Sequence, residues 1–431
     1  MQLPWLDPDE QGAVVQALVG HGLIKWSNQR NLPLKSGGFT DVYINLRDAR
    51  NHPPMIGLIS DLYASALRRL HVDRFLEIPD SVSCFAGTIS QMTGMPYITV
   101  REAPKVGRVA KAQTIGSALP GTRAAIIDDV ITDGASKVIP YQVAVGMGLD
   151  VRSLVVLVDR QQGWQKHLAD LGIDLEVWPG MTLHDVRRLL ITSGLMERCD
   201  PNLEARNPII VALDGKSWEE ILPIIDPLRT TGCIFKVNDL LIAEGSDRLL
   251  PNLMTYGRVM ADVKGHDIPN TLENISRKLR KCPPWAITVH ASGGQEMIAK
   301  TVKIFEGTAT KVLAVTVLTS IDQTTCEEIY RRMPIDQVMA LAEIANRAGA
   351  HGIVCSPEET QALKAKYPNA TIVNPGIRSE GTSADDQKRI STPGGAMASG
   401  ASNLVMGRQI LNAPDPVAEV MRVLNQELNI H

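Results

Sequence analysis

The sequence predicts an α/β protein with two domains, an open doubly wound sheet followed by a (β/α)8 TIM barrel. A chain of 431 residues is too long for one ordinary hydrophobic core and fits two domains. The segment CDPNLEARNP, residues 199–208, is polar, carries two prolines and is typical of a domain boundary. Short apolar runs alternate with helical stretches on both sides of it. We therefore expect one domain over residues 1–200 and another over residues 207–431.

The composition favours a globular protein that binds neither nucleic acid nor a membrane. The chain is 44% hydrophobic and 21% charged with a net charge of −3, so it has no excess of positive charge. Its start, MQLPWLDPDEQ, does not resemble a signal peptide, and apolar runs such as SLVVLV are too short to span a bilayer. The six cysteines are scattered without metal or disulfide spacing, which indicates reduced thiols and a cytoplasmic location.

Four strands are expected in the first domain, each separated from the next by a helical segment. They are RFLEIP, PYITVRE, RAAIIDDV and RSLVVLVDR, at residues 74–79, 96–102, 123–130 and 152–160. The small number of strands and the irregular start favour an open, doubly wound sheet.

Eight strands are expected in the second domain. Each is a continuously apolar, β-branched run followed by a helical stretch, which is typical of a parallel sheet covered on both faces. Eight such units fit a (β/α)8 barrel, which takes about 250 residues. The runs occupy residues 209–214, 233–238, 258–264, 285–291, 311–320, 351–356, 370–377 and 403–408.

Charged and hydroxyl side chains gather where the strands of this predicted barrel end. Chemistry in (β/α)8 barrels lies at the carboxyl ends of the strands, and charges on buried strands are costly unless they are paired. The set therefore predicts a functional site: Asp214, Lys236, Asp262, Lys264, Ser292, Thr319, Ser320, Arg378 and Arg408.

The stretch ADVKGHDIPNT, residues 261–271, is the densest part of this set. Asp262 and Lys264 are two residues apart and so share one face of a strand, where Lys236 of the adjacent strand can reach Asp262. An alternating array Lys236–Asp262–Lys264–Asp267 would hold each charge by its neighbours. Asp267 follows the strand in a loop that aims it away from its own barrel mouth, which suggests that it serves a neighbouring subunit.

The runs VALD, FKV, DVKGHDIPNT, VHASGG, AVTVLTS, IVCS, PGIR, DDQKRI and MGRQI occur in this order over residues 207–431. Together they closely resemble the orotidine 5′-monophosphate decarboxylase family. The resemblance implies loss of CO2 from C6 of the pyrimidine nucleotide to give UMP, in de novo pyrimidine biosynthesis, without a cofactor and without a metal.

The resemblance also implies a role for individual residues of the barrel. Lys264 would protonate C6, and Asp262 would face the leaving carboxylate. Lys236 would contact the ribose and orient Asp262. The other implied contacts are Asp214 to ribose hydroxyls, Asp267 and Thr271 across the interface of a homodimer or higher homo-oligomer, Thr319 to the pyrimidine, and Arg378, Gln387, Gly407 and Arg408 to the phosphate.

The sequence departs from this family at two positions, where Gly265 replaces a bulky residue and Gln409 replaces a proline. The competing interpretation is a sugar-phosphate decarboxylase of the same superfamily, in which the acids of the DxKxxD pattern bind magnesium. HDIPNT, VLTS and the DDQ segment favour the nucleotide enzyme.

In the first domain, the segment AAIIDDVITDGAS, residues 124–136, predicts a strand, an acidic pair and a turn before a helix. Such a turn offers backbone N–H groups to a phosphate. The segment resembles the phosphoribosyl pyrophosphate motif of type I phosphoribosyltransferases. LKSGGFTDVYINLR and LVDRQQG resemble orotate phosphoribosyltransferase in particular, with Mg2+ accompanying phosphoribosyl pyrophosphate. The implied ligand contacts are Lys35, Arg101, Asp128, Asp129, Thr132, Gly134, Ser136 and Arg160, with Lys105 as a catalytic residue of a loop at VREAPKVG.

This second resemblance has departures that remove positive charge or add negative charge. Glu102 stands where the family loop has a lysine, Val106 and Gly107 change the end of that loop, and Asp133 lies in the phosphate turn. No tyrosine–lysine pair is found near SVSCFAG. Each lost charge-assisted contact costs about 1.5–3 kcal/mol.

Two hypotheses follow for the whole chain, whose domain order resembles the fused UMP synthase family. In one, the transferase makes orotidine 5′-monophosphate from orotate and phosphoribosyl pyrophosphate, and the barrel converts it to UMP. In the other, only the barrel is active, and the first domain is a degenerate module for dimerisation or ligand sensing.

Overall fold

A computed structural model describes residues 4–28, 31–33, 39–101, 114–381, 389 and 391–431. The chain divides into two compact units, Met1–Met196 and Glu197–His431. The segment expected to separate the domains, residues 199–208, contains a helix of the second unit, α7 (Pro201–Arg206). Asp200 caps this helix, because its side chain accepts a hydrogen bond from the Asn202 N–H, and Pro201 occupies the first turn, where a missing N–H costs nothing.

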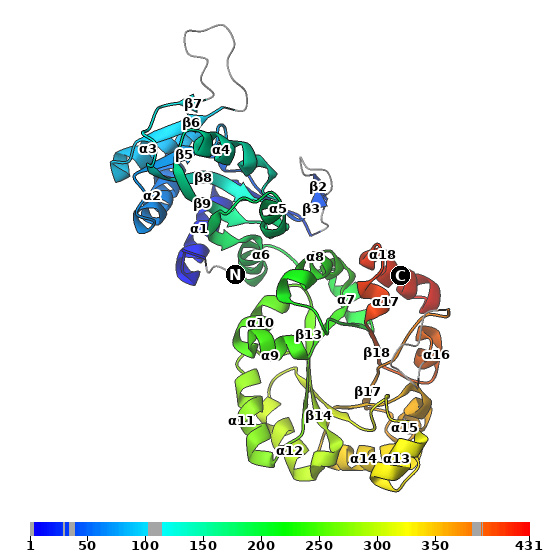
Figure 1. Cartoon of the computed structure of the whole chain (residues 1–431). Coiled ribbons are helices and arrows are strands. Elements are labelled where there is room, and N and C mark those ends of the chain that lie inside the picture. The colour runs from blue at the N-terminus through cyan, green and yellow to red at the C-terminus, as the bar shows by residue number, and fades with distance from the viewer. Residues whose placement is uncertain (1–3, 29–30, 34–38, 102–113, 382–388, 390) are drawn as a thin grey trace. The chain divides into compact units, whose positions relative to one another are not determined.

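The first unit contains a six-stranded sheet in the order β10-β9-β8-β5-β6-β7 (Figure 1). All neighbours are parallel except β6 and β7. The four predicted strands are present as β5, β6, β8 and β9, and β7 and β10 were not predicted. The strands are β5 (Arg74–Glu77), β6 (Tyr97–Val100), β7 (Thr114–Ile115), β8 (Arg123–Ile131), β9 (Asp150–Asp159) and β10 (Glu176–Thr182).

Helices cover both faces of this sheet, which confirms the doubly wound architecture. Ala125 and Ile127 of β8 pack with apolar residues of α1, α2, α3 and α6. Ala124 and Ile126 pack on the other face, with residues of α4 and α5. The alternation follows from the two-residue period of a strand. The helices are α1 (Pro8–Gly20), α2 (Pro53–Arg69), α3 (Ser83–Thr93), α4 (Ala135–Gly146), α5 (Trp164–Asp170) and α6 (Leu183–Thr192).

Two small antiparallel pairs complete the strands of the first unit. One pairs β1 (Ile24–Trp26) with β4 (Val42–Ile44), and the other pairs β2 (Leu32–Pro33) with β3 (Phe39–Thr40). A 3-10 helix, η1 (Leu46–Asn51), follows β4.

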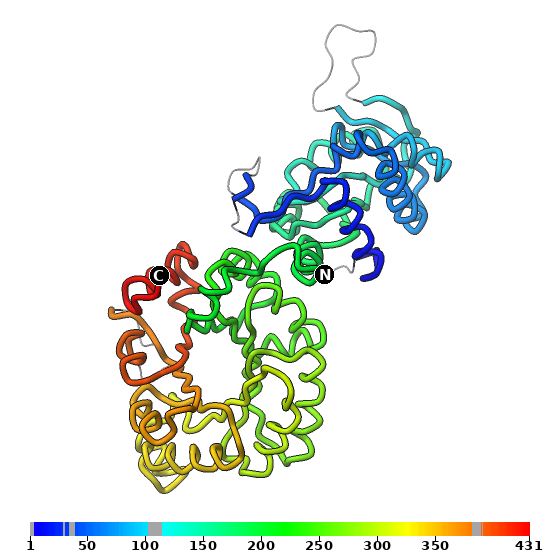
Figure 2. Tube along the Cα trace, turned by 180° about the vertical axis from the view of Figure 1, so that it is seen from behind, coloured from blue at the N-terminus to red at the C-terminus, as the bar shows by residue number. Residues whose placement is uncertain are grey.

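The second unit is a closed barrel of parallel strands, β11 to β18, in sequence order. All eight predicted runs contain a barrel strand, so the fold prediction is confirmed. Figure 2 lets the reader follow the chain around this ring from behind. The strands are β11 (Ile209–Ala212), β12 (Ile234–Val237), β13 (Arg258–Gly265), β14 (Ala286–His290), β15 (Lys311–Val315), β16 (Gly352–Val354), β17 (Thr371–Asn374) and β18 (Asn403–Met406).

Helices surround the barrel on the outside. The α-helices are α8 (Trp218–Leu228), α9 (Asp239–Glu244), α10 (Ser246–Leu253), α11 (Pro269–Leu279), α12 (Gly294–Phe305), α13 (Gln323–Tyr330), α14 (Pro334–Arg347), α15 (Thr360–Lys366), α16 (Pro393–Ala398), α17 (Arg408–Leu411) and α18 (Pro416–Arg422). Short 3-10 turns are η2 (Arg229–Thr231), η3 (Ala291–Gly293) and η4 (Pro357–Glu359), and a π-helical turn, η5 (Val423–Glu427), follows α18.

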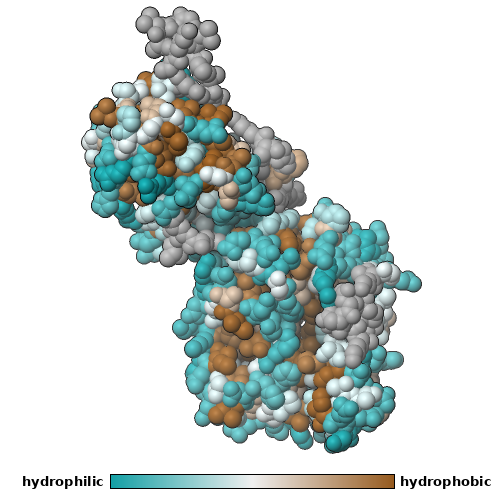
Figure 3. Space-filling model, viewed as in Figure 1, coloured by the Kyte–Doolittle hydropathy of each residue, from teal (hydrophilic) through white to brown (hydrophobic). Residues whose placement is uncertain are grey.

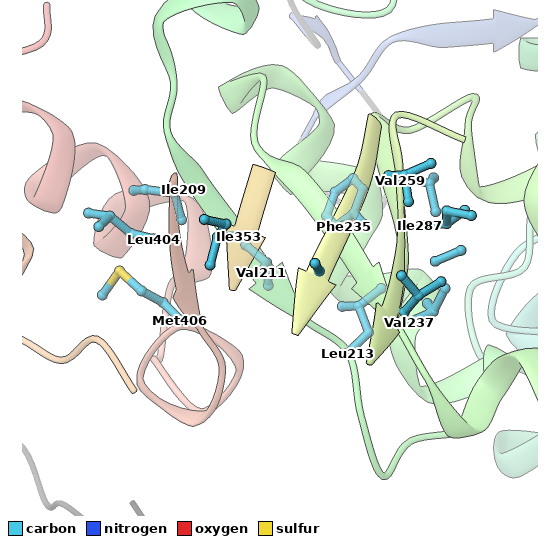
Figure 4. Close-up of a cluster of buried hydrophobic side chains, with 14 of the residues drawn as sticks. Ile209, Val211, Leu213, Phe235, Val237, Val259, Ile287, Ile353, Leu404 and Met406 are labelled. Carbon is cyan, nitrogen blue, oxygen red and sulfur yellow. The ribbon is translucent and has the colours of Figure 1, made fainter. Parts of the chain in front are cut away.

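Strand alternation determines which side chains face the site. Val211, Phe235 and Val237 belong to the large core cluster between strands and helices (Figure 4). Ile210, Ile234 and Met260 belong to a separate small cluster in the barrel interior. Lys236 and Asp262 each lie two residues after a member of that inner cluster, so the same alternation points them inward at the carboxyl ends of their strands.

Hydrophilic residues predominate on the visible face of the barrel unit, with hydrophobic residues in patches between them (Figure 3). Among the described residues, no helix is both long and apolar enough to cross a membrane. All six cysteines are free thiols.

Candidate active site

Four charged residues at the carboxyl ends of β11, β12 and β13 form one chain of ion pairs. The Lys236 ammonium lies 2.6 Å from the Asp214 carboxylate and 3.1 Å from that of Asp262. The Lys264 ammonium lies 2.5 Å from Asp262. The side chains of Lys236 and Asp262 are only 8% and 7% exposed, whereas Lys264 is 35% exposed. A fixed cation therefore faces the open side of the group, next to a buried carboxylate.

Thr288 of β14 holds this arrangement together. Its hydroxyl donates to one Asp262 oxygen at 2.8 Å and accepts the Lys264 N–H at 2.9 Å. The β13–β14 register shifts between Ala261 and Gly265, and Lys264 has a left-handed φ of 49°. Asn238 supports the other side, because its amide donates to the Asp262 carbonyl at 2.8 Å. Asp262 and Lys264 were expected on one face of a regular strand. Their side chains do meet, but the strand is irregular between them.

Burial and ion pairing act against each other on the two buried charges. Burial raises the pKa of Asp262, but the ammonium groups of Lys236 and Lys264 and the bond from Thr288 outweigh it, so the pKa is lowered from 3.8. Burial lowers the pKa of Lys236, but Asp262 and Asp214 outweigh it, so the pKa is raised from 10.5. Both residues therefore stay charged around neutral pH.

A cavity of about 640 Å³ opens beside these charges. Its lining includes the two arginines that the resemblance assigns to phosphate, Arg378 and Arg408, together with Gly407. Thr319 and Ser320 also line it. The cavity thus combines an ion-pair network, two arginines and apolar side chains such as Val317 and Val354.

Gln409, next to Arg408, ties the segment after Arg378 to helix α18. Its side chain accepts from the Ser379 N–H at 2.9 Å and donates to Glu419 at 2.7 Å. Arg422 of α18 in turn bonds Glu419 and the Ser379 hydroxyl. Gln409 therefore holds Ser379, the residue after Arg378, through its side-chain amide. A proline at position 409 would have no side-chain group to make this bond.

Gly265 has a steric explanation in this chain. A Cβ atom at Gly265 would lie 2.4 Å from Leu272 Cδ1, so the end of the Leu272 side chain would have to move. Leu272 is buried in the barrel core, so it fills the space that a side chain at position 265 would need.

Other predicted residues lie outside this group. Asp267 is exposed and, among the described residues, its carboxylate accepts only the Ile268 N–H, at 2.6 Å. Within one chain, Asp214 extends the array beyond Lys236. The contact of Asp267 with the site of a neighbouring subunit stays a prediction. Thr271 of α11 and Ser292 of η3 do not line the cavity. Gln387 lies outside the described residues.

In the first unit, the predicted turn joins β8 to α4 as expected. Gly134 has a left-handed φ of 83°, and a Cβ there would press on Trp164 and Leu168 of α5 at 3.3 Å. The Thr132 hydroxyl donates to Asp133, and the Asp133 carboxylate accepts the Ala135 N–H at 3.0 Å. The phosphate-type turn is present, with an acidic side chain bonded to it.

Asp128 at the end of β8 makes a buried ion pair with Lys137 of α4. Their side chains are 3% and 4% exposed, and Ser136 lies within 2.9 Å of the same ammonium. Burial, and then the neighbouring Asp128 carboxylate, raise the pKa of Asp129 to about 7. Arg160 is buried and donates to Thr40 at 3.1 Å. Arg101 ends the described part of its segment, and Lys35 and Lys105 lie outside the described residues.

Thr288, Asn238 and Lys137 were not predicted from the sequence. Thr288 lies inside an apolar strand, where a threonine is expected for its β-branched shape alone. A lysine in a first helical turn is usually solvated, so Lys137 carried no signal. For Asn238, the position directly after a predicted strand was the available signal.

A sequence model of the "Orotidine 5'-phosphate decarboxylase / HUMPS family" matches residues 207–423. The orotidine 5′-phosphate decarboxylase of Pseudomonas aeruginosa is 38% identical over 224 residues, which is 51% of this chain and 97% of that protein. The corresponding protein of Neisseria meningitidis is 37% identical over 235 residues, covering 52% and 96%.

Two solved structures are also similar to parts of this chain. That of orotidine 5′-phosphate decarboxylase from Lactobacillus acidophilus has a TM-score of 0.45 at 33% identity, covering 52% of this chain and 99% of that one. That of Leishmania donovani UMP synthase has a TM-score of 0.38 at 33% identity, covering 43% and 39%. The sequence matches to the barrel are sufficient by themselves: the chain belongs to the orotidine 5′-phosphate decarboxylase / HUMPS family.

Proposed function

We propose that the barrel, residues 207–431, decarboxylates orotidine 5′-monophosphate to UMP in pyrimidine biosynthesis. The observation that carries this proposal is the Asp214–Lys236–Asp262–Lys264 chain in a cavity that Arg378 and Arg408 also line. A nucleotide monophosphate would fit with its phosphate at the arginines, its ribose near Asp214 and Lys236, and its base against Thr319.

In the proposed reaction the C6–carboxylate bond breaks, CO2 leaves, and the electron pair stays on C6. The Lys264 ammonium stabilises that carbanion and transfers a proton to it, so that a solvent proton later restores the ammonium. Asp262 lies beside the leaving carboxylate and is held charged by two lysines and Thr288. Arg378, Gln387, Gly407 and Arg408 bind the phosphate, and this remote binding energy serves the transition state.

A magnesium-dependent sugar-phosphate decarboxylase is the competing function within the same family. In this chain Asp262 has one oxygen against the ammonium groups of Lys236 and Lys264 and the other bonded to Thr288. A magnesium ion would have to displace two cations from that carboxylate, which favours the metal-free nucleotide reaction.

We also propose that the site is shared between the subunits of a homodimer. Asp267 follows β13 and Thr271 lies in the first turn of α11, yet neither lines the cavity of its own chain, and Asp267 is exposed. Donation across an interface would bring these two residues to the substrate of a partner subunit.

The second candidate function is orotate phosphoribosyl transfer by residues 1–200, which would make the protein a bifunctional UMP synthase. The β8–turn–α4 arrangement with Gly134 at positive φ favours it. The residues present do not fit the Mg2+ that accompanies phosphoribosyl pyrophosphate, because both oxygens of Asp128 are bonded, one to Lys137 and one to the Asp129 N–H. We therefore derive no step through a metal ion.

An ultraviolet assay of the purified full chain tests both functions. Orotidine 5′-monophosphate alone should give UMP, and failure to do so would refute the decarboxylase. A parallel reaction with orotate, phosphoribosyl pyrophosphate and magnesium gives UMP only if the first unit is also active.

A further inference from the structure

The turn after β8 carries charged residues, Asp133 and the Asp128–Lys137 pair, to which the proposed functions give no role. Asp128 and Lys137 are both buried, and their ion pair engages an acid of the motif that the resemblance assigns to ligand contact. One Asp128 oxygen contacts Lys137, and the other accepts the Asp129 N–H at 2.8 Å. Tyr63 fixes the backbone below it by donating to the Asp128 carbonyl at 2.6 Å. No oxygen of this carboxylate remains without a partner.

The N-terminal end of α4 is engaged as well. Asp133 accepts the Ala135 N–H at 3.0 Å and the Thr132 hydroxyl at 3.3 Å. Those two donors are the groups that a turn of this kind presents to a phosphate oxygen. A carboxylate has the charge and geometry of such an anion, so Asp133 satisfies the turn from within the chain, and a phosphate would meet its negative charge.

We propose that Lys137 and Asp133 close this turn to magnesium phosphoribosyl pyrophosphate. The ammonium of Lys137 replaces an external cation at Asp128, and the carboxylate of Asp133 replaces an external anion at the start of α4. The first unit then forms no nucleotide, and a separate phosphoribosyl transfer to a pyrimidine base must supply the substrate of the barrel. This last consequence rests on the proposed decarboxylase function.

The two residues offer different kinds of test. Asp133 is exposed, so Asp133→Ser leaves the fold intact and frees the Ala135 N–H. Lys137→Met keeps the length of the buried side chain but leaves Asp128 in need of a cation. Lys166→Met is the matched control, because Lys166 of α5 also pairs with an aspartate, Asp170 at 2.7 Å, but on the surface of the same unit.

The experiment measures binding of phosphoribosyl pyrophosphate by isothermal titration calorimetry, with and without magnesium, to the full chain. We expect no binding at ligand concentrations up to about 1 mM for the wild type and for Lys166→Met. The double variant Asp133→Ser/Lys137→Met should gain magnesium-dependent binding by at least about tenfold, and Asp133→Ser alone should gain weaker binding of inorganic pyrophosphate.

Binding to the wild type with a Kd below about 1 mM would overturn the proposal, and this result needs no variant to fold. A correctly folded double variant that gains nothing would overturn it too, since the closure would then lie elsewhere; circular dichroism verifies the fold. Decarboxylation of orotidine 5′-monophosphate is measured in each sample. Its absence in the wild type would refute the proposed function of the barrel without changing the binding result.

Discussion

The Lys264 ammonium lies 2.5 Å from the Asp262 carboxylate, and a single hydroxyl, that of Thr288, bonds both the carboxylate of one residue and the backbone of the other. The backbone of Lys264 is left-handed at this point, a conformation that costs of order 1 kcal/mol or more in a residue with a side chain. The cation is therefore fixed beside the carboxylate before any ligand enters, at the expense of local strain.

Replacing Lys264 by alanine should lower kcat for orotidine 5′-monophosphate by at least about 1,000-fold, because the group that stabilises and protonates C6 is lost. Steady-state kinetics checks this, with Lys281→Ala as control, since Lys281 is a surface lysine 3.8 Å from Asp247. Retained turnover in Lys264→Ala would contradict the assigned role.

Thr288→Val should lower kcat by about 100-fold with little change in KM, because Asp262 and Lys264 lose the hydroxyl that positions them. The variant should also lose about 1–3 kcal/mol of unfolding free energy, since it leaves a buried acceptor without its donor. Thr288→Ser should restore most of both quantities. Equal defects in the serine and valine variants would point to packing rather than to the hydroxyl.

Gln409→Ala should raise KM by about fivefold to tenfold and leave kcat within about twofold. Its bonds to Ser379 and Glu419 hold the segment that follows Arg378, which the proposed function assigns to the phosphate rather than to the reacting carbon. Gln323→Ala is the control, because Gln323 donates to Glu327 on an exposed helix of the same barrel. A fall in kcat at constant KM would disprove this separation of roles.

Asp267→Ala and Lys264→Ala proteins should each be inactive, but an equal mixture after subunit exchange should regain about a quarter of wild-type activity. Half of the mixed dimers are hybrids, and one of the two sites in each hybrid has both residues intact. Activity is measured after mild dissociation and reassembly. No recovery, with hybrids verified by mass spectrometry, would count against a shared site.

The charge network should also appear in the pH dependence of stability. Asp262 has a lowered pKa, because its cations outweigh burial, so its contribution is present above 3.8 and lost as pH falls through the lower folded value. Lys236 has a raised pKa, so its contribution is present below 10.5 and lost as pH rises through the higher folded value. Between these limits the network adds a constant stabilisation.

Lys236→Met should move the acid limit upward, because burial then raises the pKa of Asp262 with one less cation to oppose it. Melting temperatures between about pH 3 and pH 8 check this against Lys281→Met. An unchanged acid limit would mean that Lys236 does not hold the charge of Asp262.

The barrel could be predicted strand by strand because each strand is buried on both faces and therefore reads as a continuous apolar run. β10 was missed for the opposite reason: its sequence EVWPGMT contains a proline and a glycine, which normally interrupt strands. Strand alternation likewise explains why Lys236 and Asp262 could be expected together. The bulge at Lys264 could not be, since it depends on the register with β14.

Contacts between distant segments explain the other omissions. Lys137 is nine residues from Asp128, and only the packing of α4 on β8 brings its ammonium to that carboxylate. Gln409 is 30 residues from Ser379 and acts through a hydrogen bond that no local pattern contains. The sequence could therefore indicate which side chains have chemistry, but not which of them are already satisfied by another residue.

The contact between Gly265 and Leu272 has a consequence for how this barrel can diverge. Because the end of the Leu272 side chain fills the space beside β13, a larger residue at position 265 requires that side chain to move or to become smaller. In relatives with a bulky residue after the lysine, a smaller side chain should stand at the position of Leu272, and the two positions should covary across an alignment. If the two residues are replaced one at a time, the intermediate protein has either a close contact or a void beside Lys264. The two substitutions are therefore expected to occur together.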